Sequence, residues 1–323
     1  MESLCVRVSR EEGEETRQLL ADEGVLDHEL RIQQENGYLY IPVREVPEDL
    51  PTERREFEER DDTTDAVDIV GYEPRFETVG DIALLEPEED DEAGEALVEA
   101  DNGIVTALRV ESAVEGRERT RRMSYVAGER KTRTVHREYG REFVVDLTDV
   151  YFTPRLAEER ERVASQVEAD ERVFDMFAGV GPFAVAAAEA GAGVIASDIN
   201  DRAVELLREN ATRNGVDDRV VAYNEDARDV AERVASEGGA DRIYMNLPHT
   251  ADEFLDAACE AARSGAVIHY YDIRHEDDLF DGAVEEIRDA AASAGYGVEV
   301  LERVVVRSYA PYDYNVCVDA RLV

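Results

Sequence analysis

A glycine turn in the second half of the chain is well suited to bind a ligand. It reads DMFAGVGPF (175–183), ends an apolar run and leads into the helix-like FAVAAAEA. Gly179 and Gly181 let the backbone approach a ligand closely and adopt dihedral angles that side chains forbid. A dinucleotide-binding turn would follow the pattern GxGxxG, but the third glycine is replaced by Ala184. The turn therefore favours an amino-acid-bearing nucleoside over a pyrophosphate.

Polar residues also end the next three apolar runs. Asp198 (in ASDIN) is an acceptor suited to two ribose hydroxyls. Asp226 (in NEDA, 224–227) stands where a carboxylate and a backbone N–H can read an adenine amino edge, and Asn246 begins NLPH. A single carboxylate of this kind is more often a helix N-cap than a ligand. Four polar strand ends at one edge of a parallel sheet, however, indicate S-adenosylmethionine.

Apolar runs and amphipathic helices alternate from about residue 155 onward. The runs RVFDMF, GVIAS, RVVAYN, RIYMN and AVIHYYD are separated by helical patterns. This alternation predicts an α/β, doubly wound and mostly parallel sheet. The last two runs, VEVLERVVVRSYA and YDYNVCVDARLV, are joined at Pro311 and predict an antiparallel pair that closes a seven-stranded sheet.

Two small α+β domains are predicted to precede this sheet. We expect domains at 1–62, 66–150 and 151–323. In the first, LCVRV predicts a strand, EETRQLLADEG a short helix, and Asn36-Gly37 between alternating apolar runs a hairpin. The charged stretch 47–65 has the composition of a linker or an exposed helix. The second domain carries the β-like runs GDIALLE, GIVTALRV and EFVVDL.

The charge balance is strongly acidic. The 323 residues include 77 Asp and Glu against 36 Lys and Arg, for a net charge of −41, and Lys131 is the single lysine. An acid excess spread over every segment resembles the proteins of salt-accumulating halophiles, in which molar salt screens self-repulsion. Three scattered cysteines predict neither a disulfide scaffold nor a metal site. The sequence has no signal peptide and no apolar run long enough to span a bilayer, so we expect a soluble cytoplasmic protein.

One segment opposes the overall charge. Residues 116–142 hold nine cations against four glutamates, a local charge of +5. A basic surface on an acidic protein indicates a polyanionic partner. The alternative is a strand pair with exposed arginines at alternating positions.

These motifs together resemble the tRNA (guanine-37) N1-methyltransferase family of archaeal and eukaryotic type. The resemblance rests on DMFAGVGPF, SDIN, NEDAR, ADRIYMNLP, AVIHYYD and YFTPRLAEERERV, and it covers most of 66–323. It implies a Rossmann-like class I methyltransferase domain, the cofactor S-adenosylmethionine and tRNA as partner. The N-terminal unit is similar to a small tRNA-docking domain. After SYAP the chain has Tyr312 where the family is expected to carry glycine.

The resemblance also implies roles for individual residues. Glu159 matches the proposed base that takes the N1 proton, Arg119 the donor to guanine O6, and Asn246 an amide that binds base or cofactor. The cofactor site would comprise Arg160, Phe177, Ala178, Gly179, Gly181, Asp198, Ile199, Asp226, Ala227, Asn246 and Pro248. The RNA would meet Tyr151, Arg155, Arg130, Lys131 and Arg133, with Tyr151 and Phe152 offering faces for a flipped base. No metal is expected, and we expect a monomer.

Related chemistries stay open at this point. An aminocarboxypropyl transferase of wyosine synthesis shares the fold and much of the motif set, and a methyltransferase acting also on the tricyclic intermediate is a variant. From another class, a tRNA-binding factor would hold the cofactor without turnover. Glu159 and NLP (246–248) favour methyl transfer.

Overall fold

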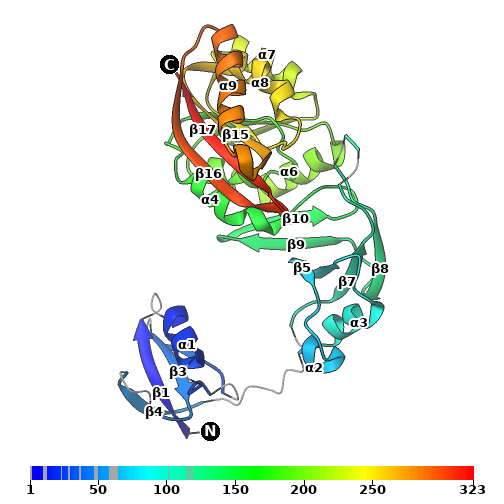
Figure 1. Cartoon of the computed structure of the whole chain (residues 1–323), viewed down its shortest axis with the longest axis vertical. Coiled ribbons are helices and arrows are strands. Elements are labelled where there is room, and N and C mark those ends of the chain that lie inside the picture. Colours follow the sequence, from blue (N-terminus) through cyan, green and yellow to red (C-terminus); the bar gives the residue numbers. More distant parts are fainter. Residues whose placement is uncertain are drawn as a thin grey trace. The chain divides into compact units, whose positions relative to one another are not determined.

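The computed structural model describes residues 2–9, 13–22, 24–27, 30–35, 38–46, 50–57, 65–100, 102–114, 116–117 and 119–323. The chain divides into two compact units, Met1–Tyr72 with Glu99–Asn102, and Glu73–Val98 with Gly103–Val323 (Figure 1). The larger unit thus contains most of the predicted middle domain together with the whole predicted methyltransferase domain. The three-domain division stays a prediction.

The smaller unit is a four-stranded sheet with a helix. The strands are in the order β2 (Gln33–Glu35), β3 (Tyr38–Val43), β1 (Glu2–Ser9) and β4 (Thr52–Glu56), and α1 spans Gly13–Asp22. Strands β2 and β3 pair antiparallel with Glu35 opposite Tyr38, as expected for the predicted hairpin, whose turn residues 36–37 lie outside the described residues. Val6, Leu20 and Ile41 are fully buried in the core of this unit.

The prediction of a linker or helix over 47–65 is wrong for residues 52–56. They form β4, which pairs antiparallel with β1 at the edge of the sheet. The sequence TERRE is charged throughout, which hid the strand, but charged side chains are common on edge strands because they discourage further pairing. The short helix α2 follows at Ala66–Val70, and residues 47–49 and 58–64 lie outside the described residues.

The larger unit begins with a small sheet and a hairpin. The sheet has the order β5 (Phe76–Val79), β6 (Ile82–Leu85), β7 (Thr106–Val110) and β8 (Met123–Gly128), with α3 at Asp91–Glu99. Strands β9 (Arg133–Glu138) and β10 (Arg141–Asp146) form the hairpin, so the basic segment contains β8 and β9. Asn210 of α6 (Asp201–Arg213) bonds both backbone groups of Val144 at 2.7 and 3.1 Å, which fixes β10 on that helix.

The predicted seven-stranded sheet is confirmed. Its order is β13 (Val220–Tyr223), β12 (Gly193–Ser197), β11 (Arg172–Asp175), β14 (Ala240–Met245), β15 (Ala262–His275), β17 (Asp313–Leu322) and β16 (Val298–Ala310). The first five strands are parallel, and β17 runs antiparallel to both of its neighbours. The predicted closing pair is therefore present, with the last strand of the chain inserted between β15 and β16.

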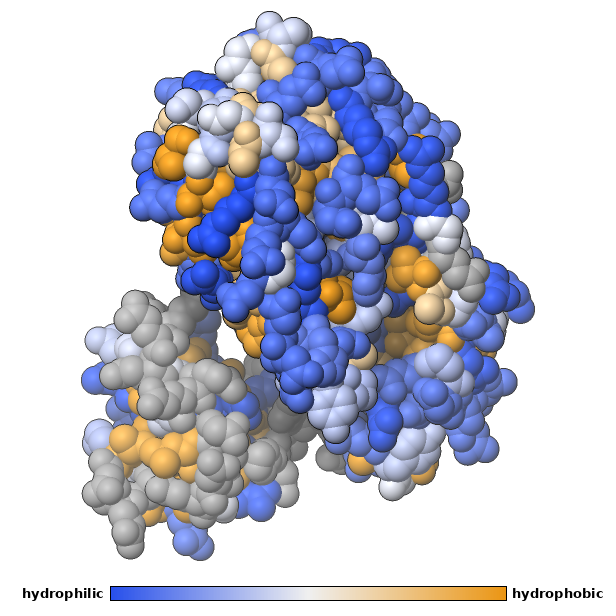
Figure 2. All heavy atoms as spheres, turned by 45° about the horizontal axis from the view of Figure 1, so that its top comes forward, coloured by the Kyte–Doolittle hydropathy of each residue, from blue (hydrophilic) through white to orange (hydrophobic). Residues whose placement is uncertain are grey.

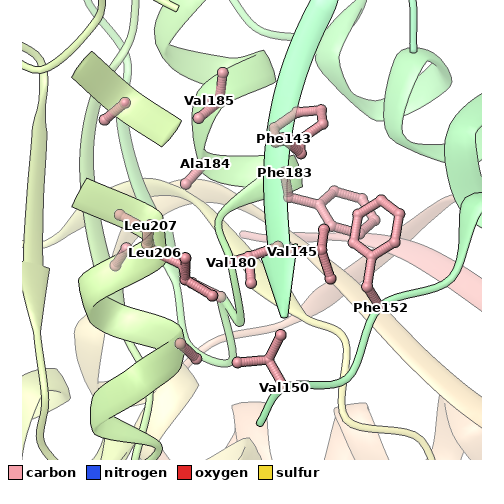
Figure 3. Close-up of a cluster of buried hydrophobic side chains, with 14 of the residues drawn as sticks. Phe143, Val145, Val150, Phe152, Val180, Phe183, Ala184, Val185, Leu206 and Leu207 are labelled. Atoms are coloured by element: carbon pink, nitrogen blue, oxygen red, sulfur yellow. The ribbon is translucent and has the colours of Figure 1, made fainter. Parts of the chain in front are cut away.

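Helices cover both faces of this sheet because successive strand residues point to opposite sides. Val173 packs with residues of α4 (Ala157–Ala164), α5 (Pro182–Glu189), α6 and β10, a cluster that includes Phe143, Phe152 and Phe183 (Figure 3). Phe174, the next residue, packs with residues of α7 (Ala227–Ser236), α8 (Leu255–Ala261) and α9 (Asp281–Ser293). Short 3₁₀ turns lie at Pro154–Leu156, Ala251–Phe254 and Glu276–Asp278.

The departure from the family motif lies in the turn between β16 and β17. Tyr312 adopts φ 69°, in the left-handed region where glycine is favoured. The backbone conformation expected of a glycine is thus formed by a tyrosine that is 62% exposed.

Hydrophilic side chains dominate the surface shown in Figure 2, with apolar ones in small separate patches. No described helix has the length and apolar character required to cross a membrane.

Candidate functional site

A cavity of about 650 Å³ lies at the carboxyl ends of the parallel strands. Its volume falls within the range of small-molecule sites. It is lined by most of the residues predicted to bind the cofactor: Arg160, Phe177, Ala178, Gly179, Asp198, Ile199, Asp226, Ala227, Asn246 and Pro248. Arg119 and Tyr151 line it as well.

The glycine turn shapes one wall of this cavity. Gly179 has φ 55° and donates its N–H to Asp198 Oδ2 at 2.8 Å. Gly181 has φ 87° and is the N-cap residue of α5, and a Cβ at this position would lie 2.8 Å from Leu207 Cγ. Gly181 does not line the cavity. Its glycine character serves the close packing of the turn on α6, whereas Gly179 borders the ligand space.

The two carboxylates predicted to contact the nucleoside also organise the backbone. Asp198 Oδ1 accepts from Asn200 N at 2.9 Å. Asp226 caps α7 by accepting from Arg228 N at 3.1 Å, and its other oxygen accepts from Arg117 at 2.7 Å. Asp226 is therefore a helix N-cap and a cavity residue at once.

Two residues with side chains have a strained backbone at or next to the cavity lining. Arg119 has φ 56° and His249 has φ 81°, both uncommon for residues with a side chain. Arg119 Nη1 donates to Pro248 O at 3.3 Å, which joins the basic segment to the loop after β14. Strain of this kind persists only where surrounding contacts enforce it, and it is frequent at binding sites.

Arg160 is buried at the cavity, with 3% of its surface exposed. It donates to Glu138 Oε2 at 2.7 Å and to Thr153 O at 2.8 Å. Burial, reinforced by the charge of Arg160, lowers the pKa of the neighbouring His136 to about 4. His136 is therefore neutral at physiological pH.

Glu159 lies outside the cavity lining. It is 5% exposed, and its carboxylate accepts from Arg162 Nε and Nη2 at 2.7 and 2.8 Å and from the Tyr271 hydroxyl at 2.8 Å. The residue predicted to act as base is thus fully engaged in this structure.

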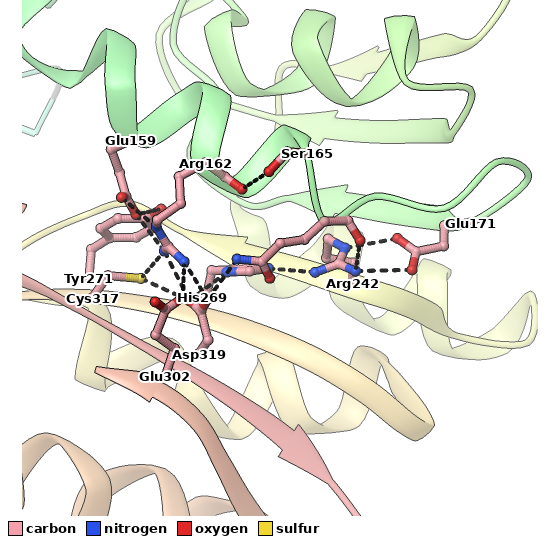
Figure 4. Close-up of polar contacts among 11 residues, drawn as sticks. Glu159, Arg162, Ser165, Glu171, Arg242, His269, Tyr271, Glu302, Cys317 and Asp319 are labelled. Atoms are coloured by element: carbon pink, nitrogen blue, oxygen red, sulfur yellow. Dashed lines mark hydrogen bonds and ion pairs between the residues drawn. The ribbon is translucent and has the colours of Figure 1, made fainter. Parts of the chain in front are cut away.

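A buried polar network continues from Glu159 under α4 (Figure 4). Arg162 also donates to Asp319 at 2.7 Å, Asp319 contacts His269 at 2.7 Å, and His269 contacts Arg242 at 2.8 Å. His269, Cys317 and Asp319 bring metal-ligand atoms within 4.8 Å of one another. Arg162 and Arg242 flank this group, and their charges oppose a cation there.

The other predicted RNA-binding residues lie apart from the cavity lining. Arg155 pairs with Glu77 at 3.1 Å, Lys131 with Asp81 at 2.6 Å and Arg133 with Glu209 at 2.6 Å. Arg130 stands over the Tyr125 ring at 4.3 Å. Much of the basic segment is thus neutralised by the protein's own carboxylates.

Sequence reasoning missed a further part of the cavity. Arg121, Arg307, Tyr309 and Asn315 line it together with Ile273. Arg121 belongs to the basic segment, and the others lie on β15–β17, where strand patterns alone gave no reason to expect a binding wall.

The seven-stranded sheet and the cavity at its parallel strand ends define a Rossmann-like methyltransferase. Residues 134–301 match the TRM5/TYW2 methyltransferase domain, and residues 5–51 match the tRNA methyltransferase 5 N-terminal domain. The chain belongs to the TRM5/TYW2 methyltransferase family.

Full-length relatives support this membership. The chain is 39% identical to the tRNA (guanine(37)-N(1))-methyltransferase Trm5b of Pyrococcus abyssi and 32% identical to that of Methanocaldococcus jannaschii, with at least 98% of each chain covered. The crystal structure of Trm5b from Pyrococcus abyssi superposes with a TM-score of 0.73, covering 99% of both chains. A complex of aTrm5 with tRNALeu gives a TM-score of 0.71 at 31% identity, covering 99% of this chain and 100% of that one.

Proposed function

We propose that this protein transfers a methyl group from S-adenosylmethionine to N1 of guanine 37 in tRNA. The observation that carries the proposal is similarity over the whole chain, including the N-terminal domain, to two enzymes named for this reaction. The cavity at the strand ends supports the proposal, because it is lined by residues predicted to bind the cofactor and by Arg119, Arg121 and Arg307.

The residues at the cofactor end fit S-adenosylmethionine. Asp198 lines the cavity and would accept from the ribose hydroxyls, and the backbone at Gly179 leaves room for close approach. Phe177, packed edge-on against Phe254 at 4.9 Å, gives an apolar surface suited to adenine. When bound, this group supplies the methyl to be transferred. Relatives have been solved with adenosine and with AdoMet.

Residues of the protein must remove the N1 proton of the guanine and stabilise the negative charge that develops on the base. N1 carries a proton at neutral pH, so the base loses it during attack and negative charge spreads to O6. A cationic donor at O6 stabilises that charge, and we assign this role to Arg119 at the cavity wall. We assign Asn246 to hold the base by its amide.

We assign to Glu159 the role of the base that takes the N1 proton. Glu159 precedes Arg160 in the first turn of α4. Glu159 can take this proton only after its carboxylate turns from Arg162 and Tyr271 toward the cavity. Arg162 stays paired in that step because it retains Asp319 and Glu302 as partners, at 2.7 and 2.8 Å. The role of Glu159 as base therefore requires this rotation of its carboxylate away from Arg162.

The tRNA partner is proposed to meet Tyr151, the basic segment and the N-terminal domain. The solved complex of a relative with tRNALeu and the match to the tRNA methyltransferase 5 N-terminal domain support this. Phosphate contacts would position the RNA, and stacking on Tyr151 would hold the target base.

We further propose that the protein works as a monomer in the cytoplasm of a salt-accumulating cell. The net charge of −41 with a single lysine supports the high-salt setting. In such salt the phosphate contacts weaken, so shape and stacking must contribute more of the affinity.

The second candidate function is aminocarboxypropyl transfer in wyosine synthesis. A Pyrococcus horikoshii enzyme named for that activity is 36% identical, but the match covers only 59% of this chain. A Saccharolobus solfataricus protein named tRNA 4-demethylwyosine(37)-methyltransferase Taw21 is 31% identical over 76% of it. The longer matches to the guanine enzymes favour methyl transfer to guanine.

Incubation of unmodified tRNA with methyl-labelled cofactor in concentrated KCl, followed by nucleoside mapping, tests the proposal. We expect 1-methylguanosine at position 37. A product heavier by an aminocarboxypropyl group, or label at another nucleotide, would reject it. A G37A transcript serves as the matched control.

A further inference from the structure

The cavity lining includes three arginines besides the residues predicted to bind the cofactor or the RNA backbone. They are Arg119, Arg121 and Arg307. The chain has 77 acidic residues for 36 basic ones, and neighbouring cations such as Arg117, Lys131 and Arg133 form ion pairs. Within the described parts of the chain, none of the three cavity arginines pairs with a carboxylate; Arg119 contacts a carbonyl and Arg121 the face of Tyr151. Three unneutralised guanidinium groups on one wall attract an anion.

Polar atoms on the same wall lack partners. Arg121 Nε and Arg307 Nε are buried without a hydrogen bond to any described residue. Asn315, directly opposite Arg307 in the β16–β17 ladder, is 2% exposed, and its Oδ1 is also without a partner in the described structure. Buried polar groups are normally satisfied, so this side of the cavity has unused hydrogen-bonding capacity: the arginine N–H groups call for acceptors such as phosphate oxygens, whereas the Asn315 oxygen accepts and calls for a donor.

Contacts between segments far apart in the sequence hold this side of the cavity together. Arg119 reaches the carbonyl of Pro248, and the ring of the next residue, His249, stands edge-on to Tyr309 at 5.3 Å. Tyr309 lies on the hairpin that also carries Arg307. The basic segment, the loop after β14 and the C-terminal hairpin therefore converge on one side of the cavity.

We propose that Arg121 and Arg307 bind the phosphodiester groups of the RNA backbone next to the target guanosine. The planar guanidinium fork of a half-buried arginine matches phosphate oxygens. The inference rests on the proposed function for the identity of the nucleic acid. It assigns the backbone contacts at the target nucleotide to this wall, whereas Arg130, Lys131 and Arg133 lie outside the cavity lining.

The test combines protein variants with a change in the RNA. A tRNA with one methylphosphonate, which has no charge, at the linkage 5′ or 3′ of nucleotide 37 is compared with the natural tRNA. Its affinity and its single-turnover rate are measured with Arg121→Met, Arg307→Met and the control Arg303→Met, an exposed residue of the same strand outside the cavity lining. Circular dichroism verifies folding of each variant.

We expect Arg121→Met and Arg307→Met each to weaken binding of natural tRNA by about 10- to 100-fold, the range for a charge-assisted hydrogen bond. A methylphosphonate at the contacted linkage should weaken tRNA binding by the wild type by the same factor. It should not weaken tRNA binding by the arginine variant any further. Arg303→Met should stay within about 2-fold of the wild type.

Two results would overturn the inference. Variants of Arg121 and Arg307 that match Arg303→Met for both RNAs would remove these arginines from the RNA contact. A loss of S-adenosylhomocysteine affinity by calorimetry, with tRNA affinity intact, would assign the arginines to the cofactor carboxylate. Because tRNA affinity is measured directly, these results are obtained whether or not the wild type methylates position 37, and failure to methylate would reject the proposed function alone.

Discussion

Arg162 holds the carboxylate of Glu159 by two parallel hydrogen bonds across one turn of α4, at 2.7 and 2.8 Å. The same guanidinium contacts Asp319 and Glu302, so three carboxylates compete for one cation. Burial by itself would raise the pKa of Asp319, but the hydrogen bonds from His269 and Arg162 outweigh it and hold this pKa well below its usual range. Asp319 is therefore a permanent anion that keeps Arg162 in place even when Glu159, which is buried and also bonded to Tyr271, gives up its two hydrogen bonds to Arg162.

Glu159→Gln should lower the rate of methyl transfer by at least about 100-fold, because general-base contributions are of that size. The affinity for S-adenosylhomocysteine should stay within 2-fold (~0.4 kcal/mol), since Glu159 does not line the cavity. Single-turnover assays and calorimetry measure the two quantities. The matched control is Glu158→Gln, an exposed neighbour in the same turn. Equal losses in both variants, or loss of cofactor affinity, would contradict the role given to Glu159.

Replacing Arg130, Lys131 and Arg133 together by glutamine should raise the KM for tRNA and leave the KM for S-adenosylmethionine unchanged. Lys131 and Arg133 are occupied by Asp81 and Glu209, whereas Arg130 contacts only an aromatic face among the contacts described. Arg130→Gln alone should therefore produce the largest single share of the effect. The assay belongs at the lowest KCl concentration at which the protein stays folded, because salt masks phosphate contacts. An unchanged KM for tRNA would place this part of the basic segment outside the interface.

Asp175 provides a test of pH dependence. Burial, with a smaller contribution from Asp198, raises the pKa of Asp175 from 3.8 to about 7. The folded state therefore binds more protons than the unfolded state between these two values, and the contribution of Asp175 to stability falls as pH rises through this window. Asp175→Asn, which cannot ionise, should gain stability relative to the wild type between about pH 4 and about pH 7. Denaturant unfolding at constant KCl measures the difference, and a gap that stays constant with pH would refute the shift.

Tyr312→Gly should raise the free energy of unfolding by up to ~1 kcal/mol, because a side chain in the left-handed region is strained and glycine is not. Tyr312→Ala is the control, since it removes the ring but keeps the Cβ at φ 69°. Thermal unfolding of the two variants separates the backbone effect from loss of the ring, which faces His275 at 6.3 Å. If alanine stabilises as much as glycine, backbone strain is not the cause.

The melting temperature should rise steeply with KCl and the protein should unfold in dilute buffer. At a net charge of −41 the folded chain repels itself, and molar salt shortens the screening length to ~3 Å. Circular dichroism melts across a KCl series give the answer, with isosmotic sucrose as the control for general solute effects. A melting temperature independent of KCl would argue against the high-salt setting.

The sequence by itself determined the fold class, the strand ends that line the cavity, and the family. These features are local: a glycine turn, polar residues after apolar runs, and a spacing of apolar residues that alternates between the strand and the helix pattern. The same reasoning failed at β4, where charged residues on an edge strand resemble a linker.

Only the tertiary structure decided which of the predicted site residues lie close together. It placed Glu159 behind the cavity wall with Arg162, occupied Lys131 and Arg133 with carboxylates 50 and 76 residues away in the chain, and brought Arg307 and Asn315 to the cavity. Insertion of the last strand between β15 and β16 carries the C-terminal hairpin to the edge where the parallel strands end. Pairing across such separations depends on the packing of the whole chain, and no local pattern encodes it.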